Sequence, residues 1–288
     1  MKQRILLLFA LILSLTLLAA CSSGGEVDPG PVKDSANALI GEDGTTPYVL
    51  IRPDDKDQNA SDAMTTLAEK LEEQTGIKFK LGTDFVKAGT QFVEGEYEIL
   101  IGDTNREASK TIGTELPRVR DWAIARIGSK IVIQGKNSLH EAVAYFLENY
   151  VADGNIYIAD GEKHVHTGTY EIDTLTVGGV SINEFTVYYD RTSAASEAAA
   201  KHFISYIRET VGYVLETGSR IPEKPEKAII FAQSPDANNY LEHRIYLDGT
   251  AIRLESGTLV NPEEAADALS SHIGIAKTAL DVVVGECG

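Results

Sequence analysis

The chain has 288 residues, of which 43% are hydrophobic and 24% charged, and its formal net charge is −17 at pH 7. These proportions are normal for a globular protein and exclude a chain that is disordered throughout. The length suits two domains of ordinary size. A nucleic-acid-binding protein needs a basic surface to displace counterions from phosphate. We therefore predict no nucleic-acid partner for so acidic a chain, whose sequence contains no basic stripe.

The first 23 residues have the pattern of a secretion signal. Two basic residues among the first four precede an apolar stretch, residues 5–20, that is short for a membrane span. The stretch ends in Leu-Ala-Ala-Cys at 18–21, which resembles the bacterial lipobox, in which the cysteine thiol is acylated and becomes the mature N-terminus. The alternative is an ordinary signal peptide with a coincidental cysteine. We expect residues 1–20 to be removed, and lipid on Cys21 to anchor the protein to the bacterial cell membrane on its extracytoplasmic side.

Residues 21–46 are rich in glycine, proline, serine and acids. Such a composition cannot bury enough apolar surface to offset chain entropy, so we expect a flexible tether between the lipid and the folded part. The remaining cysteine is Cys287. With Cys21 lipidated, no intramolecular disulfide is expected, and an inert Cys287 is favoured over a reactive thiol.

Residues 47–159 are predicted to form a first module. Its first half is expected to contain a strand at 48–52, an amphipathic helix from 61 to 75 capped by Gly76, a short strand at 77–81 and a strand at 97–101. Its second half is expected to contain a hairpin of strands 122–127 and 130–134, followed by a helix and a strand at 155–159. The helix is predicted to begin with a capping box of Ser138 and Glu141.

Residues 160–182 are expected to be a linker, and residues 183–288 a second module that repeats the first. Its expected elements are a strand at 185–189, a helix from 196 to 212, a strand at 228–231, a hairpin of strands 244–247 and 251–255, and a helix that begins at 261–264. The recurrence of the same elements in the same order indicates internal duplication. The predicted fold class is α+β: two tandem modules, each an antiparallel or mixed sheet with two helices packed on one face.

The first module resembles a known family. A helix ending in Thr75-Gly76, the run Glu-Ile-Leu-Ile-Gly-Asp-Thr-Asn-Arg at 98–106, the hairpin over 122–135 and a following helix are similar to the small α+β domain that precedes the catalytic barrel in hexosaminidase-type and α-glucuronidase-type glycoside hydrolases. The resemblance covers residues 47–159 and, more weakly, 183–273, where Ala-Gln-Ser replaces Gly-Asp-Thr. It implies an accessory domain. In those enzymes the acid–base residues belong to the barrel, which needs about 250 residues, so no catalytic residue is carried over.

Asp103, Asn105 and Arg106 follow a predicted strand, where a polar loop could hydrogen-bond a sugar. The alternative is turn chemistry, because Gly-Asp-Thr-Asn suits a tight turn with side-chain-to-backbone hydrogen bonds. His164 and His166, two residues apart, would lie on the same side of a strand and could bind a metal with Glu162. The alternative for these histidines is a solvated position in a linker.

Trp122, Tyr97 and Tyr145 could form a platform for sugar stacking, although their places on apolar strands and a helix favour core packing. The adjacent carboxylates at 54–55, 72–73 and 263–264 point to different sides of their elements and are poor acid–base pairs. The sequence contains none of the nucleophile, P-loop, metalloprotease or dinucleotide-binding motifs that we sought. We therefore predict no catalytic residue, no cofactor and no metal ligand.

The sequence favours a membrane-anchored surface lipoprotein that acts as a non-catalytic binding or spacer module, with polysaccharide as the candidate ligand. The alternative is the N-terminal accessory part of a secreted hydrolase whose catalytic domain is absent from this chain. The sequence does not indicate an oligomeric state.

Overall fold

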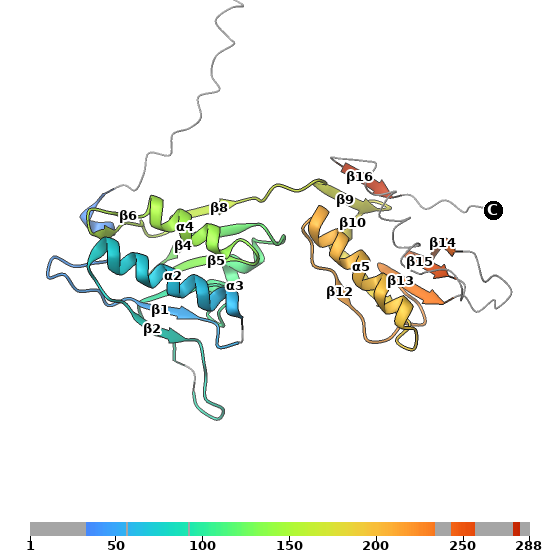
Figure 1. The fold of residues 1–288 in the computed structure, drawn as a ribbon, viewed down its shortest axis with the longest axis horizontal. Helices are drawn as coiled ribbons and strands as arrows, with labels where there is room; N and C mark the ends of the chain where they lie inside the picture. Colours follow the sequence, from blue (N-terminus) through green and yellow to red (C-terminus); the bar gives the residue numbers. More distant parts are fainter. Residues whose placement is uncertain (1–32, 56, 92, 234–242, 257–278, 283–288) are drawn as a thin grey trace, which may run out of the picture.

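The computed structural model describes residues 33–55, 57–91, 93–233, 243–256 and 279–282. These residues form mixed α+β structure, with a larger sheet in the first half of the chain and a smaller one in the second half (Figure 1). The predicted α+β class is thus confirmed. Among the described residues, no helix is both long and apolar enough to cross a membrane.

The first sheet has six strands in the order β2-β1-β3-β5-β4-β8. Their bounds are β1 Val49–Arg52, β2 Lys80–Thr83, β3 Glu98–Ile101, β4 Trp122–Ile127, β5 Lys130–Gly135 and β8 Lys163–His166. β1 is parallel to β2 and β3, and β3 is parallel to β5, whereas β4 is antiparallel to β5 and β8. The sheet is therefore mixed. Antiparallel pairing is confirmed for the predicted hairpin β4–β5, whereas the connection from β1 to β2 runs through a helix and allows parallel pairing.

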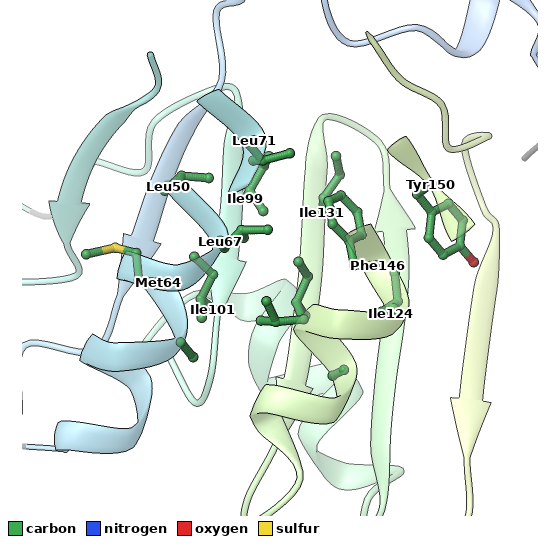
Figure 2. Packing of buried hydrophobic residues seen from close by; sticks show 14 of the residues in the cluster. Leu50, Met64, Leu67, Leu71, Ile99, Ile101, Ile124, Ile131, Phe146 and Tyr150 are labelled. Carbon is green, nitrogen blue, oxygen red and sulfur yellow. The ribbon is translucent and has the colours of Figure 1, made fainter. Parts of the chain in front are cut away.

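Helices cover both faces of this sheet. α2 (Gln58–Thr75) and α4 (Leu139–Asn149) pack on one face, as predicted, and their core side chains meet those of the strands (Figure 2). α3 (Glu107–Thr114) packs on the opposite face through Ala108 and Ile112. The sequence pattern does not predict α3, because this short helix contains a glycine and buries only two apolar side chains.

The helices α2 and α4 differ in how their ends are capped. Asp57 caps α2 by accepting a hydrogen bond from the Asn59 amide at 2.9 Å, and Gly76 ends the helix in the left-handed conformation at φ 73°, as predicted. Ser138 occupies the N-cap position of α4, but its hydroxyl donates to the Asp121 carbonyl at 3.0 Å instead. The predicted capping box is therefore wrong.

The segments before and after the first module contain more structure than their composition indicates. Leu39 is buried against the core, and its amide donates to the Ile156 carbonyl at 3.0 Å, although a flexible tether is predicted there. β6 (Val151–Ala152) and β7 (Asn155–Ile156) form a separate two-stranded ribbon, which replaces the longer strand predicted at 155–159. β8, which pairs with β4, lies in the segment predicted to be a linker.

The second sheet has five strands in the order β12-β11-β13-β15-β14. Their bounds are β11 Thr186–Tyr189, β12 Glu216–Thr217, β13 Ala228–Gln233, β14 His243–Asp248 and β15 Ala251–Ser256. The order and directions match those of β2-β1-β3-β5-β4. α5 (Ala194–Thr210) packs on one face. The helix predicted from residue 261 lies outside the described residues.

A third, three-stranded sheet follows the first module and is completed near the end of the chain. Its strands are β9 (Thr174–Val177), β10 (Val180–Ser181) and β16 (Ala279–Val282), and short 3-10 turns lie at η1 (Ser35–Asn37) and η2 (Ile182–Glu184). The two halves of the chain also contact each other through loops: the Val119 amide, in the turn before β4, donates to the carbonyl of Gly212, which follows α5, at 2.9 Å.

Candidate functional site

A groove of about 790 Å³ opens at the carboxyl ends of β3 and β5. In sheets with parallel strands and crossover helices, this edge is where a crevice for ligands forms. The N-termini of α2 and α4, the second half of α3 and the turns after the two strands supply the walls. The polar side chains of these walls are Asp57, Asn59, Asp103, Lys110, Thr114, Gln134, Lys136 and Asn137.

The turn after β3 is fixed by hydrogen bonds to Asp84, which is 7% exposed. One carboxylate oxygen of Asp84 accepts from the Asp54 amide at 2.7 Å, and the other accepts from the Asn105 amide at 2.6 Å. The Asn105 side chain returns a hydrogen bond to the Asp84 carbonyl at 2.7 Å. Of the polar residues predicted in this turn, Asn105 is thus structural, whereas Asp103 is exposed and lines the groove.

Replacing Asp84 with alanine is expected to lower the free energy of unfolding by about 1.5–3 kcal/mol, because it removes the buried carboxylate that accepts two part-buried backbone hydrogen bonds. Urea unfolding measures the loss. Asp103→Ala, in the same region but exposed, is the control and should change stability by less than about 0.5 kcal/mol. Equal losses in the two variants would show that Asp84 does not hold the turn.

Arg106 does not reach the groove. Its Nη2 lies 3.0 Å from Glu98 Oε1 and its Nε lies 3.1 Å from Glu98 Oε2, and both side chains are buried. The Lys130 ammonium lies 2.7 Å from Glu98 Oε2 and also contacts the Gly95 carbonyl. Burial alone raises the pKa of Glu98, but the hydrogen bonds and charges of Arg106 and Lys130 outweigh it, so that the pKa is lowered. This cluster is a buried structural ion pair.

Gln134 is the buried polar residue of the groove. Its side chain is 6% exposed, and its Oε1 has no hydrogen-bond partner in the described part of the chain. Gly113 of α3 makes room for this amide, because a Cβ at position 113 would lie 2.8 Å from Gln134 Nε2. Gln134 is not among the site residues predicted from the sequence; the available signal is that one polar residue ends the apolar run 131–133.

The three aromatic residues considered for sugar stacking lie outside the groove, and only two of them contact each other. Trp122 and Tyr145 have ring centroids 5.0 Å apart, whereas Tyr97 packs edge-on against Tyr48. His164 stacks on Tyr145 at 4.4 Å and His166 stacks on Trp122 at 4.9 Å. Since Trp122 is only 4% exposed, it packs in the core and is not an open platform.

The histidines lie on one side of β8, as their spacing predicts. Glu162 does not join them, because its carboxylate accepts from the Ala159 amide at 2.8 Å. Within the described ranges, no group of three or more His, Cys, Asp or Glu side chains is placed to hold a metal ion. The two imidazoles therefore serve as aromatic packing partners.

No protein-family model matches the sequence, and no curated protein matches it. Among solved structures, a mutant β-hexosaminidase of Streptomyces plicatus in complex with the product GlcNAc has a TM-score of 0.29 and 11% identity, over 64% of this chain and 32% of that chain. The N-acetyl-β-hexosaminidase of Streptomyces plicatus in complex with thio-NAglucal has a TM-score of 0.29 and 10% identity, over 77% of this chain and 40% of that chain. This chain thus spans about a third to two fifths of those enzymes. The likeness to these glycoside hydrolases is loose, and it assigns neither a family nor an activity.

Proposed function

We propose that this protein is a lipid-anchored, extracytoplasmic binding module that holds a carbohydrate in the groove of its first module and performs no catalysis of its own. The observation that carries the proposal is the groove at the carboxyl ends of β3 and β5, whose volume lies in the range of small-ligand sites. Its walls combine amides and carboxylates. Amides donate and accept hydrogen bonds and carboxylates accept them, as sugar hydroxyls require.

The chemistry of the walls favours binding over reaction. Asp57 already caps α2, and Asp103 is exposed at the rim. A general acid or base needs a pKa adjusted to its task by burial or by a neighbouring charge. Among the described residues, three carboxylates are buried: Asp84, Glu98 and Asp121. Glu98 is paired with Arg106 and Lys130, and the other two accept hydrogen bonds from backbone amides.

The membrane anchor is part of the same proposal, and it is supported by the sequence at 18–21, outside the described residues. Radiolabelled palmitate is expected to enter the wild-type protein and not the Cys21→Ala variant. A wild-type protein that remains unlabelled would contradict lipid anchoring and leave carbohydrate binding to be tested separately.

We also propose that the two modules arose by duplication, supported by the shared strand order of their sheets. The polar turn after β3 has no counterpart in the second module, where Ala232 and Gln233 continue β13. The second module would then act as a spacer and the first as the binding unit.

A glycan array probed with the full chain in detergent tests carbohydrate binding. The proposal predicts binding to at least one glycan, weakened in Asp103→Ala and unchanged in Asp173→Ala, an exposed aspartate outside the groove. The absence of binding to every glycan would overturn the proposed function.

A further inference from the structure

The N-terminus of α4 opens into the groove without a side-chain cap. Ser138, at the N-cap position, is turned away toward the Asp121 carbonyl, and Leu139 at the first helical position lines the groove. The first backbone N–H groups of a helix have no partner within the helix and carry the positive end of its dipole. In this 11-residue helix they are suited to an anionic group of a ligand.

The second observation is independent of the helix. Gln134 lies on the wall of the same groove, more than nine-tenths buried, with Oε1 unpartnered among the described residues. A buried acceptor without a donor destabilises the folded protein. A ligand hydroxyl that donates to this oxygen would remove the penalty. The groove thus offers an acceptor for a hydroxyl next to α3 and a site for an anion at α4.

The charges around the α4 end of the groove agree with an anionic ligand. Lys136 precedes α4 and Lys110 faces the groove from α3. Arg208 of α5 adds a third cation nearby, since its Nη2 donates to Asn137 Oδ1 at 2.9 Å. The walls also contain two carboxylates, Asp57, which caps α2, and Asp103, which follows β3. The two lysines thus balance the two aspartates of the lining, and Arg208 adds a cation beside Asn137, in a chain of net charge −17.

We infer that the ligand of the groove is an acidic carbohydrate, with its carboxylate at the N-terminus of α4 beside Lys136 and a hydroxyl bound to Gln134. This inference rests on the proposed function and specifies its substrate class. An acidic carbohydrate meets both requirements because it carries hydroxyl and carboxylate groups in one molecule. A neutral sugar would leave the helix terminus and Lys136 without an anion.

Uronic-acid oligosaccharides, each paired with its methyl ester, test the inference on the full chain in detergent. Calorimetric titration with oligogalacturonate, oligoglucuronate and hyaluronan fragments should give at least one acid that binds about tenfold or more tightly than its ester, the difference expected for one charge-assisted contact. Lys136→Met should remove this difference. Lys80→Met, an exposed lysine on β2 outside the groove, should retain it.

Gln134→Met provides a second readout. It should weaken acid and ester alike, because the hydroxyl contact is common to both, and it should raise the melting temperature by removing an unpartnered buried acceptor. Binding of neutral glycans or esters as tight as that of the acids would overturn the inference and leave the proposed function intact. Equal losses in Lys136→Met and Lys80→Met would also overturn it. No binding to any glycan would overturn both.

Discussion

Glu98→Gln is expected to destabilise the first module by about 3–5 kcal/mol, the cost of breaking a buried ion pair from one side. Glutamine keeps the shape of the side chain but removes the negative charge. The Arg106 side chain, 6% exposed, would then lose its buried anion, and the Lys130 side chain, 13% exposed, would keep, among the described carboxylates, only that of Glu94, 3.6 Å away. Urea unfolding followed by tryptophan fluorescence measures the loss, because the single tryptophan, Trp122, lies in the core of this module.

Glu96→Gln is the matched control. It changes the same functional group two residues earlier in the chain, where the side chain is exposed, and should cost less than about 0.5 kcal/mol. Similar losses at positions 96 and 98 would contradict the buried ion pair.

The stability gained from Glu98 should also depend on pH. Its pKa is lowered in the folded protein: burial raises it, but the contacts with Arg106 and Lys130 prevail. A carboxyl with a lowered folded pKa stabilises above its unfolded pKa, about 4.3, and the gain disappears as the pH falls through the folded value. The difference in unfolding free energy between wild type and Glu98→Gln should therefore be constant near neutral pH and shrink in acid. A difference that grows in acid would contradict this assignment.

Phe146→Ala is expected to cost about 3–5 kcal/mol, because it opens a cavity in a fully buried part of the core. Phe146 projects from α4 into the core that this helix shares with α2 and the sheet, with its ring 5.6 Å from that of Tyr150 (Figure 2). The shift of the Trp122 fluorescence transition in urea measures the cost.

Leu81→Ala serves as the comparison, since it truncates an apolar side chain of the same sheet that is 53% exposed. Its effect should be within about 0.5 kcal/mol of zero. If Phe146→Ala lowered the unfolding free energy only slightly, the core around α4 would have to collapse into the cavity. Packing of α4 would then contribute less to the stability of the module than its burial indicates.

The parts of the fold that the sequence predicted are those fixed by local signals. The hairpin β4–β5 follows from alternating strands around Gly128-Ser129, and the end of α2 follows from Gly76. Parallel pairing of β1, β2 and β3 depends on contacts between distant segments, and α3 has too few apolar residues to show a period. Neither could be predicted from the local pattern.

The candidate site was predicted only in part. Asp103 was a candidate for a sugar contact, with turn chemistry as the alternative, and it lines the groove, whereas Arg106 forms the ion pair with Glu98. The sequence pattern indicated a polar turn but not which of its side chains are exposed to solvent and which are buried. Gln134 and Lys136 become candidates only when β5 is placed beside β3, which brings the ends of two strands to one edge.

Hydrogen–deuterium exchange of the full chain with the tightest-binding glycan from the array tests whether the groove of the first module is the binding site. The glycan is expected to slow exchange at the amides of 102–114 and 134–141, which surround the groove, and to leave the turn between β14 and β15 unchanged. Slowed exchange confined to β8 and the histidines, or to the second sheet, would contradict it.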